Sequence, residues 1–303
     1  MPILTTVVGD GLAAHRAWAS LQRCELFEIY EGHGPFGVRG VGEAAAGSWT
    51  ELLERPEIEL LVLAVPHADR LTLSRAARAA GKAVLLEEGP PLSLRELDQL
   101  AEDDANYAVP MGMVLPLRGL LIPDHGITGL TWTSTACGGL IISHFTPASG
   151  PLCHAAHNLA QGPLERWPSQ AVIGAVTPYL DLVCQLFGKP VSAHIDGAEK
   201  GSAVGSVEFD SGARLSLVVT VRSAIEEAQL KIMDADRTVT LQGRELRVED
   251  AGGLVLHRVP PLSDLRLSSY REMAFAVHSV TTVSGHSPTS ARALADCLAL
   301  LHG

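Results

Sequence analysis

The stretch that decides the fold runs from Ile3 to Ala14 and reads ILTTVVGDGLAA. Its first part, Ile3 to Val8, is a short apolar run of the kind that forms a strand buried in a parallel sheet. The run leads directly into a G-x-G-x-x-A pattern, and the residues from His15 to Trp18 have helical character. A strand, a glycine turn and a helix in this order predict the first unit of a Rossmann fold that binds a dinucleotide.

The glycine turn is expected to hold the pyrophosphate of the dinucleotide. Gly9 permits the tight turn, Gly11 lets the backbone approach the phosphates, and the small side chain of Ala14 lets helix and strand pack closely. The phosphates would lie at the helix N-terminus, where backbone N–H groups point outward. The residues predicted to contact the cofactor here are Gly9, Asp10, Gly11, Leu12, Ala13 and Ala14. The carboxylate of Asp10 would oppose the phosphate charge unless it turns away.

A second short strand, Leu26 to Tyr30, ends in Glu31. An acidic residue at this distance from the glycine turn accepts hydrogen bonds from the ribose hydroxyls and repels a 2′-phosphate. The sequence therefore favours NAD as cofactor, with NADP as a second possibility. The alternative is that the glycine turn belongs to a doubly wound sheet without a cofactor and that Glu31 is a solvated strand end.

Strands and helices alternate over the rest of the first hundred residues. Strands are expected at Leu60–Val65 and Ala83–Leu86, and helices at Arg70–Ala80 and Leu94–Glu102. This alternation predicts a parallel sheet covered by helices.

Three segments, GDGLAA, LLERPEIELLVLAVPHADR and AARAAGKAVLLEEGPPLSL, resemble the Gfo/Idh/MocA family of NAD(P)-dependent oxidoreductases. The resemblance continues through SQAVIGAVTPYLDLVCQLFGKPVSAHI and SSYREMAFAVHSV. It implies a Rossmann domain at residues 1–110 and an open, mixed β-sheet domain with flanking helices at residues 111–303. The second domain would bind substrate and mediate assembly into a homo-oligomer, a dimer or tetramer. It also implies that Val65, Pro66, His67 and Glu87 line the cofactor site.

The residues that carry the chemistry of this family are replaced in this chain. The resemblance implies a lysine before the proline of the third segment, and an Asp and a His four residues apart on one helix. These positions hold Glu88, Gly174 and Pro178. The proton donor, its orienting partner and the cation that stabilises an oxyanion are therefore absent, and Glu88 reverses the charge.

Three side chains are candidates for a replacement catalytic role. His67 titrates near neutral pH and could donate a proton. Glu88, if protonated in an apolar pocket, could do the same. Tyr179 lies beside the position of the missing histidine. The alternatives are a surface histidine that caps a helix, a solvated turn carboxylate and a core tyrosine.

The substrate site is expected to be apolar on one side. The segment from Val109 to Leu117 offers almost no hydrogen-bonding side chain, so Met113 and Leu115 favour an apolar or planar ligand over a sugar. Ordinary core packing is the alternative. His144, His154, His157 and Asn158 are also expected near the ligand, because loops on a rigid scaffold often carry specificity. Cys153 and its neighbouring histidines lack a matching ligand pair, so no metal site is predicted.

Composition excludes several other classes of function. The net charge of −11 argues against nucleic acid and anionic membranes as partners. The N-terminus has neither a signal-peptide pattern nor a membrane span. Five scattered cysteines are most simply free thiols in the cytoplasm.

Two main functional hypotheses follow. The first is an atypical NAD(P)-dependent reductase of an apolar or conjugated small molecule such as an imine, which needs hydride but less oxyanion stabilisation. The second is a catalytically degenerate relative that serves as a dinucleotide-binding or partner subunit. A redox-neutral enzyme with a resident cofactor is a third, weaker hypothesis.

Overall fold

The structure is a computed structural model of the whole chain. It describes residues 1–9, 11–30, 38–39, 43–44, 49–65, 67–87, 94–121, 138–144, 167–197, 202–220, 227–233, 237–242, 245–259, 265–279, 281, 283 and 285–302. The chain divides into two compact units. The first comprises Met1–Pro116 and Arg266–Arg292, and the second comprises Leu117–Leu265 and Ala293–Gly303.

The first unit is the predicted Rossmann domain. Its elements are β1 (Ile3–Gly9), α1 (Gly11–Gln22), β2 (Phe27–Ile29), β3 (Val38–Arg39), β4 (Glu43–Ala44), α2 (Trp49–Glu54), β5 (Leu60–Ala64), α3 (His67–Ala79), β6 (Ala83–Leu86), α4 (Leu94–Asn106), β7 (Met111–Met113), α7 (Leu267–Ser279) and the 3₁₀ turn η5 (Thr289–Ala291). Five strands form a parallel sheet in the order β2-β1-β5-β6-β7. The predicted strands and helices of this domain are confirmed, with ends that differ by a few residues.

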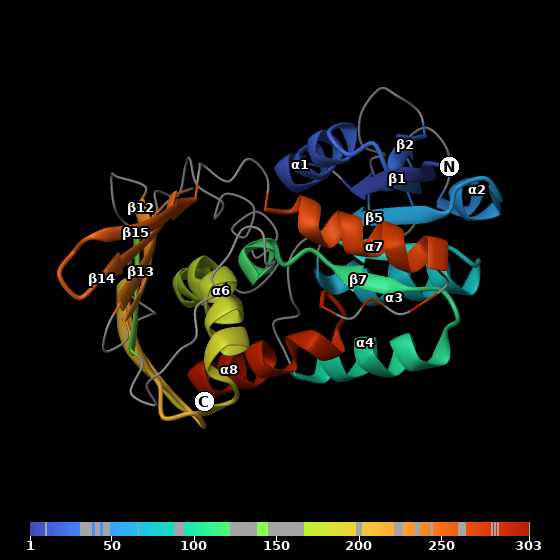
Figure 1. Cartoon of the computed structure of the whole chain (residues 1–303). Helices are drawn as coiled ribbons and strands as arrows, with labels where there is room; N and C mark the ends of the chain where they lie inside the picture. Colours follow the sequence, from blue (N-terminus) through green and yellow to red (C-terminus); the bar gives the residue numbers. More distant parts are fainter. Residues whose placement is uncertain are drawn as a thin grey trace. The chain divides into compact units, whose positions relative to one another are not determined.

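Apolar side chains explain why these strands form the centre of the sheet. All five residues of β5 and all four of β6 are buried, as expected for strands covered on both faces. Tyr270 and Met273 of α7 belong to the same buried cluster as β1 and α1. Figure 1 shows α7, in orange-red, lying along this sheet. The first unit thus includes a C-terminal segment that a division at residue 110 places in the second domain.

The second unit is the predicted open, mixed sheet with flanking helices. Its elements are η1 (Pro116–Leu121), β8 (Gly138–His144), α6 (Trp167–Phe187), β9 (Pro190–Asp196), β10 (Ser202–Phe209), β11 (Arg214–Thr220), β12 (Glu227–Met233), β13 (Arg237–Gln242), β14 (Glu245–Asp250), β15 (Val255–Val259) and α8 (Arg292–His302). The eight strands lie in the order β15-β14-β13-β12-β8-β11-β10-β9. Strand β11 pairs in parallel with β8, whereas the other pairings are antiparallel.

One face of this sheet packs against α6 and α8. Leu215, Leu217 and Val219 of β11 are buried in one apolar cluster with Leu180 of α6 and Leu298 of α8. The alternating residues of the strands point to the other face, where Val204 and Val218 pair across β10 and β11 and remain 57% and 39% exposed. This alternation is the period of a sheet that is covered on one side.

Candidate functional site at the carboxyl edge of the parallel sheet

The glycine turn has the backbone that its sequence predicts. Gly9 ends β1 with φ of +137°, a conformation that side chains of L-residues rarely adopt. A Cβ atom at this position would lie 2.0 Å from the carbonyl oxygen of Ala64 on the neighbouring strand β5. Ala14, in the first turn of α1, is fully buried, as the close packing of helix and strand requires. The first and third positions of the motif therefore fit a pyrophosphate-binding turn.

The carboxyl ends of β1, β5, β6 and β7 meet at one edge of the sheet because these strands are parallel. Ligands of open α/β sheets bind outside this edge. Three of the residues predicted to line the cofactor site are placed there by the strands that they follow. Val65 comes directly after β5, His67 begins α3, and Glu87 comes directly after β6. The sequence-based placement of this edge is therefore supported by the topology.

Glu87 is the most constrained side chain at this edge. Its side chain is 0% exposed. Its Oε2 atom accepts a hydrogen bond of 2.7 Å from the hydroxyl of Tyr270, and Oε1 is ion-paired with Nη1 of Arg266. The backbone N–H of Glu87 donates to the carbonyl of Leu63 at 2.9 Å. A buried carboxylate is tolerated only when it is paired and hydrogen-bonded, and these contacts meet that condition.

Sequence reasoning identified Glu87 but missed its partners. Arg266 and Tyr270 lie 179 and 183 residues further along the chain. Nothing local in the sequence marks them, because Tyr270 has the spacing of an ordinary core residue on a helix. The carboxylate of Glu87 is engaged with these two residues, and a contact between Glu87 and a cofactor stays a prediction.

A second polar network secures the residues that follow β7. The N–H of Leu115 donates to Oγ of Ser269 at 3.2 Å, and Oγ lies 3.0 Å from Nδ1 of His286. Nε2 of His286 lies 3.6 Å from Oε2 of Glu272. The imidazole of His286 thus bridges the hydroxyl of Ser269 and the carboxylate of Glu272.

The predicted substrate residues Met113 and Leu115 are 0% and 2% exposed. The N–H of Met113 also donates to the carbonyl of His286 at 2.7 Å. Their burial favours the alternative of core packing over direct contact with a ligand. The contacts with Ser269 and His286 hold the backbone of this segment at the end of β7.

Helix α6 of the second unit contains the positions at which the resemblance implies an Asp and a His. Gly174 and Pro178 lie four residues apart on this continuous helix and so share one face. Pro178 has no N–H to donate to the carbonyl of Gly174, and neither residue can carry a titratable proton. Tyr179 is half-buried and packs against the apolar cluster of the second unit. This position fits its alternative interpretation as a core residue.

Asp181, on the same helix, is structural. Its Oδ1 and Oδ2 atoms accept hydrogen bonds of 2.6 and 2.9 Å from Nη2 and Nε of Arg118. Both side chains are nearly inaccessible, at 3% and 4% exposure. The pair joins α6 to η1 through a bidentate contact.

The remaining predicted site residues are not all covered by the structure. Outside the described residues lie Asp10, Glu31, Pro66, Glu88, His154, His157 and Asn158. Gly11, Leu12, His67 and His144 belong to described helices or strands, but their side chains do not belong to the described part. Within that part, no group of three or more His, Cys, Asp or Glu residues could hold a metal ion. The same part contains no helix with the length and apolar character of a membrane span.

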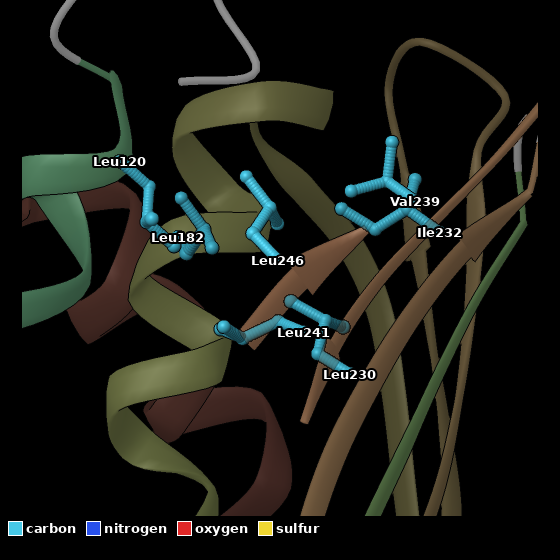
Figure 2. A pocket seen from close by; sticks show the side chains of 7 residues that line it. All are labelled: Leu120, Leu182, Leu230, Ile232, Val239, Leu241 and Leu246. Atoms are coloured by element: carbon cyan, nitrogen blue, oxygen red, sulfur yellow. The ribbon is translucent and has the colours of Figure 1, made fainter. Parts of the chain in front are cut away.

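An apolar recess in the second unit is a separate feature. Figure 2 shows it between α6, η1 and the sheet, lined only by aliphatic side chains: Leu120, Leu182, Leu230, Ile232, Val239, Leu241 and Leu246. It leaves no space for a water molecule and offers no polar atom. The recess is core packing and contributes nothing to a site for proton or hydride chemistry.

The sequence matches no protein-family profile and no curated protein. Solved structures, in contrast, match over nearly the whole chain. UDP-N-acetylglucosamine 3-dehydrogenase GnnA from Acidithiobacillus ferrooxidans is 14% identical with a TM-score of 0.73, over 99% of this chain and 97% of that chain.

Two further similar structures contain cofactors. The WlbA dehydrogenase from Bordetella pertussis in complex with NADH and UDP-GlcNAcA is 15% identical with a TM-score of 0.68, over 100% of this chain and 96% of that one. Biliverdin reductase from Synechocystis sp. PCC 6803 in complex with biliverdin and NADP⁺ is 16% identical with a TM-score of 0.70, over the full length of both chains.

These comparisons establish the fold of the chain. This chain has the two-domain fold of Gfo/Idh/MocA-type oxidoreductases, and the resemblance found in the sequence motifs is confirmed at the level of fold. At these identities the similarity concerns the fold, and the chemistry has to be argued from this chain's own residues.

Proposed function

We propose that this protein is an atypical NAD(P)-dependent oxidoreductase that reduces an apolar or conjugated small molecule such as an imine. The observation that carries the proposal is the turn at Gly9, which brings β1 against β5 so closely that only glycine fits. Structures with the same fold bind NADH or NADP⁺, which supports a dinucleotide at this turn.

Different residues of this chain would contact different parts of the dinucleotide. The turn from Gly9 to Ala14 would receive the pyrophosphate at the N-terminus of α1. Glu31 would accept the ribose hydroxyls, which favours NAD, and the backbone at Val65 and Glu87 would border the nicotinamide end. The nicotinamide, when bound, supplies a hydride. His67 is the proposed proton donor, with Glu88 as a second acid.

The replacement of the usual acid by Gly174 and Pro178 guides the choice of substrate. A carbonyl reduced to an alkoxide needs a cation or a proton donor at the oxygen, and α6 offers neither at these positions. A protonated imine carries its positive charge before hydride arrives, so its reduction develops no oxyanion. This difference favours an imine or a conjugated system over a sugar hydroxyl.

Calorimetric titration of the protein with NADH and with NADPH tests whether it binds a dinucleotide. We expect binding of NADH with a dissociation constant below about 1 mM and weaker binding of NADPH. No binding of either at millimolar concentration would refute the proposal. If a panel of cyclic imines yields turnover, His67→Ala should lower kcat by roughly 100-fold or more. An unchanged kcat would remove His67 from the mechanism.

The same observation at Gly174 and Pro178 supports a second candidate. A relative that keeps the glycine turn but lacks these polar groups could serve as a dinucleotide-binding or partner subunit. It would bind NADH as tightly as the first proposal requires, yet oxidise no NADH with any imine or conjugated substrate in the panel. Binding and turnover measured on one preparation separate the two candidates.

We also propose that the protein is a cytoplasmic homo-oligomer. Free thiols at Cys24 and Cys184 fit a reducing compartment. The exposed pair Val204 and Val218 supports contact between copies through the outer face of the eight-stranded sheet. Val218→Glu should then convert a dimer or tetramer into monomer in light scattering. Leu254→Glu, a 66% exposed position in the turn before β15, should leave the mass unchanged.

A further inference from the structure

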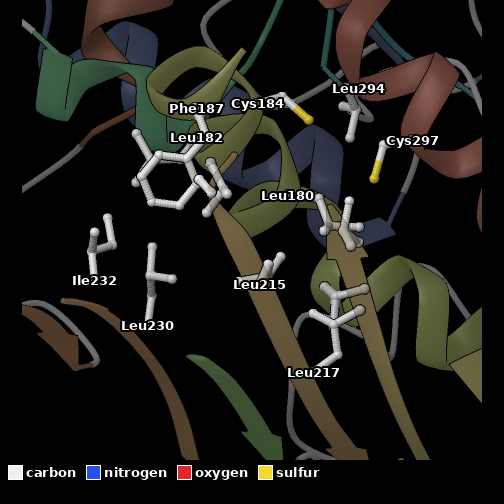
Figure 3. Close-up of a cluster of buried hydrophobic side chains, with 14 of the residues drawn as sticks. Leu180, Leu182, Cys184, Phe187, Leu215, Leu217, Leu230, Ile232, Leu294 and Cys297 are labelled. Carbon is white, nitrogen blue, oxygen red and sulfur yellow. The ribbon is translucent and has the colours of Figure 1, made fainter. Parts of the chain in front are cut away.

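Two cysteines from distant parts of the chain meet in the core of the second unit. Cys184 lies in the last turn of α6 and Cys297 in the middle of α8. They are 3% and 0% exposed and belong to the same apolar cluster. Figure 3 labels both cysteines within this cluster, with their sulfur atoms in yellow.

The two thiols interact with one another. The side chains of Cys184 and Cys297 are hydrogen-bonded to one another. Sγ of Cys184 also donates to the carbonyl oxygen of Ala293 at 3.6 Å, one helical turn before Cys297 on α8. Cys184 is therefore linked to α8 by two contacts, one to the backbone of Ala293 and one to Cys297 itself.

We propose that Cys184 and Cys297 form a reversible disulfide that joins α6 to α8 when the protein is exposed to an oxidant. The thiolate of one cysteine displaces the reduced oxidant from the oxidised sulfur of the other, and one S–S bond replaces two S–H bonds. Two electrons and two protons pass to the oxidant: a peroxide becomes water, and a diazene such as diamide becomes a hydrazine.

The surroundings of the pair determine how fast this reaction runs. The hydrogen bond with Cys297, and then burial, raise the pKa of Cys184 well above that of a free thiol. Because the thiolate is the reacting species, the pair stays reduced during brief exposure and closes only under sustained oxidation. The rate rises with pH as the thiolate fraction increases.

Once formed, the disulfide encloses more than a third of the chain, including the sheet from β9 to β15. A crosslink over so long a loop removes many conformations of the unfolded chain. It also fixes α6, the helix that carries Gly174, Pro178 and Asp181, against its neighbour. The inference concerns this core alone and is independent of the cofactor that the protein uses.

The test begins with the full-length protein. The sample is incubated with diamide to completion, quenched, and digested without reduction. We expect mass spectrometry to find the peptide that contains Cys184 linked to the peptide that contains Cys297, with a loss of two hydrogens that dithiothreitol restores. The oxidised protein should melt roughly 5 to 15 °C higher than the same sample after reduction.

A variant in which Cys24, Cys137 and Cys153 are replaced by serine leaves only the proposed pair. Thiol titration in denaturant should fall from two thiols per chain to none after diamide. Adding Cys297→Ser should leave the remaining thiol reduced and abolish the change in melting temperature. The proposal is overturned if both thiols of the pair still titrate after complete oxidation, or if the wild-type digest links either one to a different cysteine.

Discussion

The two units of this protein bury polar groups to very different extents. Among the described residues, the buried polar and charged side chains of the second unit are Arg118, Thr177 and Asp181, whereas the remaining ones belong to the first unit. The second unit is an apolar layer between a sheet and two helices, and its described residues include one buried ion pair, Arg118–Asp181. The first unit places Glu87, Ser269 and His286 in its interior next to the carboxyl edge of its sheet.

This difference shows that the desolvation cost of buried polar side chains falls mainly on the first unit. Burying a carboxylate or imidazole lowers the stability of the fold unless each polar atom is paired. An apolar residue at the same position would avoid this desolvation cost. The networks around Glu87 and Ser269 hold backbone segments at the edge where ligands of such sheets bind. The comparison therefore supports positioning as the role of the first unit's buried polar groups, and simple attachment as the role of the second unit's pair.

The largest effect is expected from Asp181→Ala. The change leaves the guanidinium of Arg118 buried and without its bidentate partner, at a cost of about 3 to 5 kcal/mol in the free energy of unfolding. Urea denaturation measures the loss. The matched control is Asp98→Ala, which breaks an exposed pair with Arg292 and should cost about 1 kcal/mol or less. Equal losses in the two variants would show that burial does not set the value of these pairs.

Gly9→Ala should have the next largest effect. The added Cβ would lie 2.0 Å from the carbonyl oxygen of Ala64, so β1 and β5 must separate. We expect a loss of about 2 to 4 kcal/mol and a loss of NADH binding.

Gly81→Ala provides the control for the Gly9 variant. Gly81 has φ of +76° but nothing within 4 Å of a Cβ atom, so it should cost only about 1 to 2 kcal/mol and leave NADH binding unchanged. The role of the glycine turn would be wrong if Gly9→Ala bound NADH normally.

The two regions also differ in how well the sequence predicted them. An apolar run such as Ile3 to Val8 and the glycine pattern after it are local signals, readable from consecutive residues. The central strands of the first unit were therefore predicted to within a residue or two at each end. The assignment of Met113 and Leu115 to a substrate site stays a prediction. Both residues are buried, and an apolar strand next to a cleft has the same sequence pattern as one in the core.

The partners of Glu87 could not be predicted for a different reason. Arg266 and Tyr270 contact Glu87 only because the chain returns to the first unit after Leu265. No periodicity or spacing encodes such a contact. The resemblance pointed to Glu87, but the residues that pair with its carboxylate are determined by tertiary structure.

Ser269→Ala sharpens the comparison with a moderate effect. Without the hydroxyl, the buried N–H of Leu115 loses its acceptor and Nδ1 of His286 loses a hydrogen-bond partner. We expect a loss of about 1 to 3 kcal/mol in urea denaturation. Ser192→Ala removes an exposed hydroxyl that donates to Glu208 and should change stability by less than about 0.5 kcal/mol. A loss below that bound at Ser269 would mean that the network after β7 is dispensable.

The smallest effect concerns Asp104, which pairs with Arg78 at 3.2 Å in the first unit. Burial raises the pKa of Asp104 in spite of this partner, and burial lowers the pKa of Arg78 in spite of two nearby carboxylates. Nη1 of Arg78 is also buried without a hydrogen-bond partner within the described part of the chain. Desolvation therefore outweighs attraction in this pair.

The sign of the pH dependence follows from the raised pKa of Asp104. The native state holds this proton to higher pH than the unfolded chain, whose value is near 3.8. The protonated carboxyl contributes its full stability at a pH below the pKa of the unfolded chain. This contribution is lost as the pH rises through the higher pKa of the native state. Asp104→Asn cannot ionise, so the melting temperature of wild type should fall relative to this variant as the pH rises from about 4. If wild type instead gained on the variant over this range, attraction to Arg78 would exceed desolvation, and the first unit's buried charges would be net stabilising.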